Sequence, residues 1–365
     1  MREALALARR GEGSTRPNPP VGAVVVARGG CVGRGWHRKA GGPHAEVFAL
    51  EEAGWRARGA TIYVTLEPCS TWGRTGPCTE RVISSGIRRV VFGVRDPHPK
   101  HQGAGTKVLR KAGIQVTEGV SEPEARELIR PFEKRVRTGL PYVTLKMAMS
   151  LDGRIAEPGG KSRWVSGPAS RAEVGKLRRR VDAVLVGRRT VSLDDPNLSP
   201  GPSARGSKMP FRIVADSLGQ TPLSSRILTD GRQCRTIIAV TEACPKARVR
   251  RFQRLGAAAW VLPNARGGVS LKALLERLGR EGFLRVLCEG GGELAASLVA
   301  GGLVDEYLFF VAPKLLGSRS LPLIGGAKSW PLDSCPTLRF TGAGMSGPDA
   351  MLRAFPARRR PCSPA

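Results

Sequence analysis

The sequence predicts an α/β protein made of two domains. Short apolar runs rich in Val and Ile alternate with amphipathic helical segments along most of the chain, and such serial alternation is typical of a sheet covered by helices. With 365 residues, the chain is long enough for two ordinary cores. The pattern is punctuated by Gly139 and Pro141 and then restarts with a strand, so the predicted domain boundary lies near residue 140.

The first region, residues 1–139, is expected to alternate helices and strands. Helical periodicity covers the start of the chain, the segment after His44, the segment that Gly86 ends, and a long amphipathic stretch over 121–137. Two adjacent apolar runs predict a strand hairpin, and two further runs predict buried strands. These four strand segments are residues 21–29, 31–36, 60–66 and 88–94.

The second region, residues 140–356, repeats this alternation. Five apolar runs predict buried strands, and a sixth strand is expected within 306–317. The five runs are residues 181–187, 211–216, 235–240, 257–262 and 284–289. Residues 200–208, rich in Pro, Gly and Ser, predict a mobile loop. The basic, Pro-rich tail over 357–365 is predicted to be disordered.

Composition limits the classes of function. Hydrophobic residues make up 41% and charged residues 24%, as in soluble globular proteins. The sequence has no apolar run approaching the roughly 18 residues that span a bilayer, and its start predicts a helix rather than a signal peptide. A cytoplasmic protein without a membrane partner is therefore expected. The net charge of +29 is spread over both halves, which favours a phosphorylated substrate and cofactor over nucleic acid as the main partner.

One histidine and two cysteines in the first region suit a catalytic zinc. Such a zinc takes three nitrogen or sulfur ligands and leaves one position for water, and His44, Cys69 and Cys78 supply one nitrogen and two sulfurs. His44 and Cys78 each lie at the start of a predicted helix, and Cys69 lies in a turn after a strand. The alternative is a pair of core cysteines or a structural zinc, but a closed structural site would need a fourth ligand beside this cluster.

Glu46 lies two residues after His44 and is placed to move protons without binding the metal. Zinc deaminases carry the pattern H-x-E followed by P-C-x-x-C. Here HAE and PC fit, but Cys78 follows Cys69 after eight intervening residues instead of two.

Three fragments of the first region resemble the deaminase half of the bifunctional riboflavin-biosynthesis deaminase–reductase family. They are PNPPVGAVVV, GGPHAEVFAL and TLEPCSTWGRTGPC. The resemblance implies a cytidine-deaminase-like three-layer α/β/α domain that binds Zn²⁺. It also implies hydrolytic removal of the 2-amino group from a diaminopyrimidinone carrying a ribosylamino 5′-phosphate. Asn18 matches a position that holds the pyrimidine ring, although an Asn-Pro turn is the alternative. His37 is left without a role.

The second region contains no histidine, so imidazole cannot be its general acid. The stretch LCEGGGELAASLV predicts a strand, a glycine turn and a helix, which suits a phosphate group. On its own this signal is weak, since such turns are common and the stretch is not the dinucleotide fingerprint.

Five fragments resemble the reductase half of the same family and occur in the same order along the chain. The fold of that half is similar to dihydrofolate reductase. They are LKMAMSLDGRIA, SRWVSG, VGRRTVSLDDPNLS, FRIVADS and EGGGELAASL. The resemblance implies NADPH-dependent reduction of the ribosyl group to ribityl. It implies cofactor contacts from Ala148, Trp164, Thr190, Asp194, Ser217, Gly291, Gly292, Glu293, Leu294, Ala295, Ala296 and Ser297. It implies substrate contacts from Ser162, Arg178, Leu198 and Glu289.

Four residues of the second region raise more specific expectations. Arg178 is the expected partner of the 5′-phosphate, because guanidinium binds phosphate through two parallel hydrogen bonds. The sequence KLRRR alone does not show which of its three arginines points inward. Lys146 can polarise the reacting sugar, and Asp194 can assist proton transfer. The family has an arginine soon after Leu198, and whether Arg205 fills this role is open.

Two rival hypotheses share some of these features. A nucleobase or tRNA deaminase would use the same zinc ligands and the positive charge, but it has no need of a nicotinamide domain, which would then be inactive or repurposed. A zinc-stabilised nucleic-acid-binding protein would not need Glu46 beside the ligands. The exposed strand edges of the second domain can serve as a dimer surface, so we expect that the chain can form a homo-oligomer.

Overall fold

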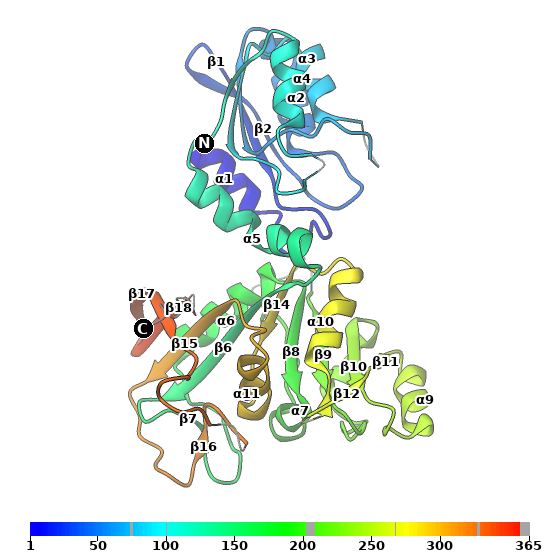
Figure 1. Cartoon of the computed structure of the whole chain (residues 1–365), viewed down its shortest axis with the longest axis vertical. Coiled ribbons are helices and arrows are strands. Elements are labelled where there is room, and N and C mark those ends of the chain that lie inside the picture. The colour runs from blue at the N-terminus through cyan, green and yellow to red at the C-terminus, as the bar shows by residue number, and fades with distance from the viewer. Residues whose placement is uncertain (74–75, 100, 202–208, 267, 327–328, 358–365) are drawn as a thin grey trace, which may run out of the picture. The chain divides into compact units, whose positions relative to one another are not determined.

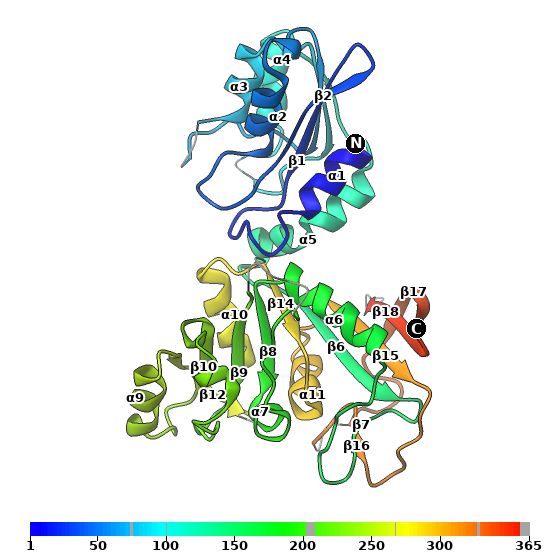
Figure 2. The ribbon, with the colours of Figure 1, turned by 180° about the vertical axis from the view of Figure 1, so that it is seen from behind.

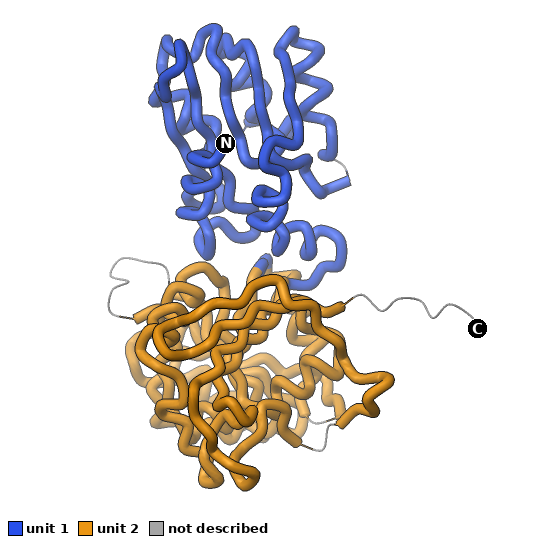
Figure 3. The backbone as a smooth tube through the Cα atoms, turned by 90° about the vertical axis from the view of Figure 1, so that its left-hand side faces the viewer, with its two compact units in different colours: residues 1–141, 282–284 blue, residues 142–281, 285–365 orange. Residues whose placement is uncertain are grey.

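A computed structural model describes residues 1–73, 76–99, 101–201, 209–266, 268–326 and 329–357. The chain forms two compact units (Figure 3), of which unit 1 comprises Met1–Pro141 and Gly282–Leu284 and unit 2 comprises Tyr142–Glu281 and Arg285–Ala365. Of the predicted tail at 357–365, only Ala357 is described. Arg205 and most of the loop at 200–208 also lie outside the described residues.

Unit 1 is a five-stranded sheet with helices on both faces (Figure 1). The strand order is β2-β1-β3-β4-β5, with β1 antiparallel to β2 and β3, and with β3, β4 and β5 parallel. The helices are α1 (Arg2–Arg9), α2 (Ala45–Ala53), α3 (Cys78–Ser84), α4 (Ala104–Lys111) and α5 (Glu122–Thr138). The strands are β1 (Gly22–Ala27), β2 (Gly30–Trp36), β3 (Thr61–Leu66), β4 (Arg89–Val94) and β5 (Gln115–Thr117).

Two apolar cores hold the three layers of unit 1 together. Ala49 of α2, Val82 of α3 and Leu109 of α4 pack with one set of buried strand residues. Leu5 of α1 and Leu128 of α5 pack with another set, and Figure 2 shows these two helices side by side. The predicted three-layer α/β/α arrangement is confirmed.

Two glycines of β2 bring α2 into direct contact with the sheet. A Cβ atom at Gly33 would lie 2.1 Å from the Ala49 carbonyl oxygen, and one at Gly35 would lie 2.2 Å from that of Ala45. A larger side chain at either position would therefore push the helix away. This close packing fixes the first turn of α2, where His44 is the N-cap.

Unit 2 is built on a nine-stranded sheet in the order β11-β10-β9-β8-β14-β6-β15-β18-β17. The first seven strands in this order are parallel to one another. Strand β18 is antiparallel to β15, and β17 is antiparallel to β18. These strands are β6 (Tyr142–Ser150), β8 (Ala183–Gly187), β9 (Phe211–Ala215), β10 (Thr236–Val240), β11 (Ala258–Val261), β14 (Arg285–Cys288), β15 (Glu306–Ala312), β17 (Leu338–Ser346) and β18 (Asp349–Pro356).

Helices and two short ribbons complete unit 2. The helices are α6 (Pro168–Arg180), α7 (Arg188–Asp194), α8 (Arg226–Thr229), α9 (Lys246–Arg254), α10 (Leu271–Arg280) and α11 (Gly292–Ala300). The ribbons pair β12 (Asn264–Ala265) with β13 (Gly268–Val269), and β16 (Leu321–Pro322) with β7 (Arg154–Ala156). Among the described residues, no helix is both long and apolar enough to cross a membrane.

The sequence prediction for unit 2 is wrong at both edges of the sheet. The run at 257–262 was expected to be a buried strand, but β11 is an edge strand and Val261 is 48% exposed. At the other edge, the β17–β18 hairpin was not predicted. Its outer strand is exposed at seven consecutive positions, so it lacks the alternation of buried and exposed residues that identifies a strand.

Candidate active sites

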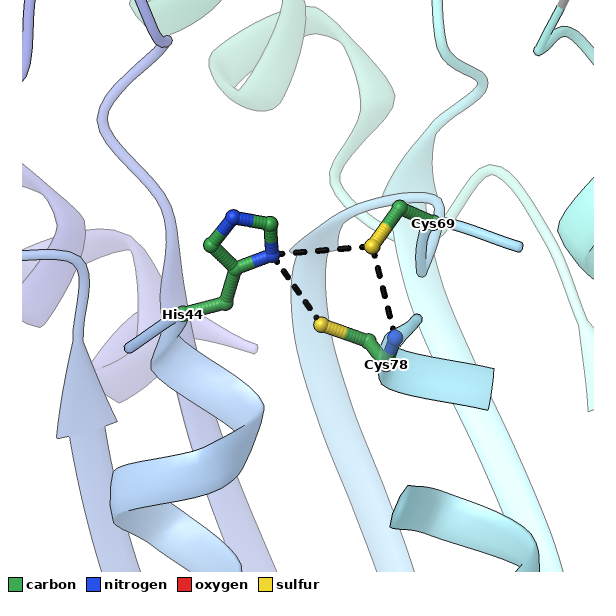
Figure 4. A group of neighbouring side chains, drawn as sticks. All are labelled: His44, Cys69 and Cys78. Atoms are coloured by element: carbon green, nitrogen blue, oxygen red, sulfur yellow. Dashed lines mark hydrogen bonds between the residues drawn. The ribbon is translucent and has the colours of Figure 1, made fainter. Parts of the chain in front are cut away.

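The three predicted zinc ligands come together where two helices begin and where a loop follows a strand (Figure 4). His44 precedes α2, Cys78 is the first residue of α3, and Cys69 lies in the loop that follows β3. His44 Nδ1 is 3.1 Å from Cys78 Sγ and 3.6 Å from Cys69 Sγ. All three donor atoms lie within 4.8 Å of one another. One nitrogen and two sulfurs at this spacing fit a zinc with an open position.

The two thiols do not titrate alike. A hydrogen bond from the Cys78 thiol lowers the pKa of Cys69 to about 4, and the same bond raises the pKa of Cys78. The backbone N–H of Cys78 also donates to Cys69 Sγ at 3.3 Å. One thiolate is therefore available at neutral pH before any metal binds.

Glu46 lies inside the first turn of α2 and is only 3% exposed. Its Oε2 has no hydrogen-bond partner among the described residues. Burial raises the pKa of this carboxyl, because the charged form loses its hydration. A buried carboxyl with a free oxygen beside a ligand cluster is suited to accept and return a proton.

Asn18 is held beside the cluster by a histidine that the sequence analysis left without a role. His37 is 2% exposed, and its ring lies 5.2 Å from that of His44. Its Nδ1 is 3.0 Å from the Pro43 carbonyl oxygen, which requires a proton on Nδ1. Burial lowers the pKa of His37, so Nε2 is left to accept from Asn18 Nδ2 at 3.1 Å. The scarcity of histidine was the only signal for this residue.

Glu67 is a second residue that the sequence analysis missed. It is 4% exposed and lies two positions before Cys69. Its carboxylate accepts from the backbone N–H groups of Asp96, Gly103 and Thr106 at 3.3, 3.0 and 3.1 Å. These bonds tie the Cys69 loop to the segment before α4 and to the first turn of that helix, so Glu67 helps to position Cys69. Its place before the PC dipeptide was the available signal.

The predicted reductase residues surround a single cleft of about 1130 Å³ in unit 2. Of these residues, Ala295 and Ala296 are not among those that line the cleft, because both are buried in α11. Leu198 lines it but is 2% exposed and packs into the core. The other predicted residues all line the cleft, together with further residues: Lys146, Ala148, Ser162, Trp164, Arg178, Thr190, Asp194, Ser217, Glu289, Gly291, Gly292, Glu293, Leu294 and Ser297.

Arg178 and Glu289 form a paired charge in this cleft. Arg178 Nε and Nη2 donate to the two oxygens of Glu289 at 2.6 and 2.8 Å, and Nη1 donates to the Ser199 carbonyl at 2.9 Å. Burial alone would raise the pKa of Glu289, but the guanidinium outweighs it and holds the pKa below its ordinary value. Arg178 is thus the inward-facing arginine of KLRRR.

Lys146 lies on β6 in the same cleft. Burial lowers the pKa of its ammonium group, and the Glu289 carboxylate opposes this effect. An ammonium group with a lowered pKa gives up its proton more readily. At the rim, Ser162 Oγ donates to Asp194 Oδ1 at 2.7 Å. Trp164 is 61% exposed, and the Arg171 guanidinium lies 4.5 Å from the centre of its ring.

Comparison with known proteins identifies the family. Residues 1–94 match the cytidine and deoxycytidylate deaminase zinc-binding region, and residues 141–352 match the RibD C-terminal domain. The riboflavin biosynthesis protein RibD of Bacillus amyloliquefaciens is 41% identical over 358 residues, which cover 98% of this chain and 95% of the relative. The chain belongs to the RibD family. RibD of Escherichia coli is 40% identical, covering 96% of this chain and 97% of its own.

Solved RibD structures have the same fold. Acinetobacter baumannii RibD superposes with a TM-score of 0.87 at 36% identity and 98% coverage of both chains. A Thermotoga maritima protein has a TM-score of 0.86 at 33% identity, covering 98% of this chain and 97% of its own. That structure is described as a diaminohydroxyphosphoribosylaminopyrimidine deaminase/5-amino-6-(5-phosphoribosylamino)uracil reductase.

Membership of the RibD family settles the class of chemistry. The chain is a bifunctional deaminase and reductase of riboflavin biosynthesis. Its cofactors are Zn²⁺ in the deaminase domain and NADPH in the reductase domain. The predicted family, fold class, enzyme class and cofactors are confirmed. The roles of individual residues rest on the geometry described above.

Proposed function

We propose that residues 1–139 hydrolyse the 2-amino group of 2,5-diamino-6-ribosylamino-pyrimidinone 5′-phosphate, and that residues 140–356 then reduce the ribosyl group to ribityl. The observation that carries this proposal is that one chain contains both a deaminase-type ligand cluster and a cleft lined by reductase-type residues. The description of the Thermotoga maritima relative names the same two activities. A small phosphorylated pyrimidine also suits the positive charge of the chain.

In the deaminase domain, His44, Cys69 and Cys78 would hold the zinc. When bound, zinc supplies a Lewis acid that makes water a nucleophile near neutral pH. Glu46 takes one proton of the attacking water and gives it to the ring nitrogen. It then takes the proton of the newly attached hydroxyl and gives it to the amino group, which leaves as ammonia while the C=O forms. Asn18, oriented by His37, holds the pyrimidine ring.

In the reductase domain, the cleft residues that include Thr190, Ser217 and Gly291 would hold NADPH, which when bound would supply the hydride for the first carbon of the ring-opened sugar. Lys146 donates a proton to the reacting group, and Glu289 orients the sugar. The sequence predicted a bidentate contact between Arg178 and the 5′-phosphate, but two of its N–H groups are bound to Glu289. A third N–H group donates to the Ser199 carbonyl. We therefore assign Arg178 to holding Glu289, with its two remaining N–H protons free for the phosphate. Ser162 completes the substrate contacts, and its hydroxyl donates to Asp194 Oδ1 at 2.7 Å. The side chain of Leu198 packs into the core, so Leu198 can offer the substrate only its backbone.

Mass spectrometry of the diaminopyrimidinone substrate after incubation with the full chain tests this assignment. Without NADPH, we expect exchange of one amino group for oxygen; with NADPH, a further gain of two hydrogens. Removing zinc with a chelator should stop the first change, whereas reduction of the deaminated intermediate should continue. If neither change occurs with folded, zinc-loaded protein, the substrate assignment is wrong. The runner-up, a tRNA or nucleobase deaminase with a repurposed second domain, would then be tested with those substrates.

We also propose that the enzyme acts in the cytoplasm and that nucleic acid is not its main partner. A homo-oligomer is supported by β17, which lies at the edge of the sheet. Phe340 and Met345 of this strand are 61% and 70% exposed. Unprotected edges of this kind can pair with another strand.

We therefore propose that β17 pairs with β17 of a second copy. The strand carries one charged residue, Arg339, near one end, so antiparallel pairing centred on Gly342 keeps the two arginines apart. The variant Ala343→Lys should convert the assembly to monomers, because it places like charges at the centre of the contact. Analytical ultracentrifugation measures this result. A wild-type monomer, or an unchanged assembly in the variant, would contradict the proposal.

A further inference from the structure

The cleft of unit 2 crosses the carboxyl ends of four neighbouring parallel strands. In spatial order these strands are β6, β14, β8 and β9. Lys146 lies on β6 and Glu289 follows β14, whereas Thr190 and Ser217 follow β8 and β9. A dinucleotide whose nicotinamide lay near Lys146 and Glu289 would therefore extend toward β8 and β9, and the ribose of its adenosine would lie at that end of the cleft.

Arg188 stands at this end without an ionic partner. Gly187, the last residue of β8, lies opposite Ala215, the last residue of β9. The two strands therefore end side by side. Arg188 follows directly, is half-buried and lines the cleft. It forms no ion pair with any residue in the described part of the chain. Its neighbour Arg189 differs, because it is exposed and bound to Glu293 at 2.8 Å.

Ser217 follows Ala215 by two residues and presents a hydroxyl at the same end of the cleft as Arg188. Its Oγ accepts from the Val269 backbone N–H at 2.8 Å, which leaves its own proton free to donate. A Cβ atom at Gly268 would lie 2.2 Å from this Oγ, so the β12–β13 ribbon is seated on Ser217. The ribbon also carries Arg266, an exposed residue that lines the cleft.

The acidic residue that precedes Ser217 is engaged within its own loop. Asp216 is 2% exposed, and its carboxylate accepts from the backbone N–H groups of Gln220 and Thr221 at 2.9 and 2.6 Å. It also accepts from Thr221 Oγ1 at 2.7 Å. Selection of an unphosphorylated ribose commonly uses a free carboxylate that accepts from the 2′-hydroxyl. Here both oxygens of the Asp216 carboxylate already accept hydrogen bonds within its own loop.

We propose that Arg188, together with Ser217 and Arg266, binds the 2′-phosphate of NADPH and makes the reductase prefer NADPH over NADH. Arg188 contributes most, because it is half-buried and its planar guanidinium can form two charge-assisted hydrogen bonds to a phosphate. The Ser217 hydroxyl donates a third bond, and the more exposed Arg266 adds a weaker attraction. This inference rests on the proposed function only in that the cofactor occupies this cleft.

Calorimetric binding to the full chain tests the inference without relying on turnover. The ligands are NADPH and NADH, and the probes are 2′,5′-ADP and 5′-ADP, which differ only in the 2′-phosphate. In Arg188→Gln, the Kd for NADPH and for 2′,5′-ADP should rise about 10- to 100-fold, the usual range for hydrogen bonds to a charged group. The Kd values for NADH and 5′-ADP should stay within about twofold.

Two further variants sharpen the result. Arg250→Gln removes the same charge from an exposed position on α9 that does not line the cleft, so it should change none of the four Kd values. Arg188→Lys keeps the charge but loses the planar fork, and we expect an intermediate weakening of NADPH binding. It also keeps the test valid if Arg188→Gln fails to fold.

The outcomes separate this inference from the proposed function. Equal weakening of NADPH and NADH in Arg188→Gln would place the arginine at the pyrophosphate and overturn the inference. Unchanged binding of all four ligands would overturn it as well, while NADPH-dependent reduction by the wild type would leave the proposed function standing. A wild-type chain that binds neither dinucleotide would overturn both.

Discussion

Replacing Glu46 by glutamine should lower the rate of deamination about 10²- to 10⁴-fold, the usual contribution of a positioned general acid–base. The amide has nearly the same shape but cannot take a proton from water and return it to the substrate. Zinc content should remain at the wild-type level, because the ligand cluster consists of His44, Cys69 and Cys78. Mass spectrometry of the substrate and elemental analysis of the protein measure the two effects.

A matched control lies on the same helix. Glu51 of α2 is exposed, and its ion pair with Arg81 has an N···O distance of 3.7 Å between exposed side chains, so it contributes little. Glu51→Gln should leave deamination unchanged. Glu46→Gln should also leave thermal stability nearly unchanged, since Oε2 has no partner to lose and the amide keeps an oxygen that can accept from the Cys78 thiol. Deamination at more than half the wild-type rate would show that Glu46 does not move the proton.

The ligand cluster could be predicted from sequence because each ligand is tied to a local signal. His44 precedes a helix, Cys78 begins one, and Cys69 follows a strand. In an α/β sheet, such positions gather at the ends of neighbouring strands. The combination of one histidine, two cysteines and an adjacent glutamate leaves few other chemistries. Here local pattern and tertiary position agree.

The supporting residues could not be predicted in the same way. His37 and Glu67 act through bonds to segments far along the chain, such as the bond from Asn18 to His37 or from Thr106 to Glu67. Their roles depend on which loops meet, and no local periodicity encodes that. The same holds for Arg188, one of 59 basic residues in the chain. Only the register between β8 and β9 places it beside Ser217.

Helix phase explains why one arginine of three faces inward in α6. Val174 is buried, and Arg178 lies four residues later on the same face. Arg179 is half-buried but does not line the cleft. The sequence contains this periodicity. A helix with three consecutive arginines at its end, however, does not reveal its phase without a known core face.

Replacing Arg178 by methionine should lower the rate of NADPH-dependent reduction about 10²- to 10³-fold and leave deamination unchanged. The change keeps the bulk of the side chain but removes the partner of Glu289, whose side chain is 9% exposed. Breaking a buried pair from one side costs roughly 3 kcal/mol, so the melting temperature of the reductase domain should also fall. Arg179→Gln removes the same charge one residue away and should have little effect on either reaction.

The pH dependence of stability distinguishes this pair from a simple packing contact. The pKa of Glu289 is held below its ordinary value, so ionisation favours the folded protein. That stabilisation is present above the ordinary glutamate pKa of about 4.3 and is lost as pH falls through the folded value. In Arg178→Met this acid-side loss should disappear, because burial then favours the protonated carboxyl.

The double variant Arg178→Met with Glu289→Gln separates stability from catalysis. With no charge left unpaired, the double variant should recover most of the lost stability, and its reduction rate should stay low because neither group can orient the sugar. The coupling energy from the four proteins measures the pair directly. If the double variant regains reduction together with stability, the pair serves only to hold the fold. Glu289 would then have no part in the reaction.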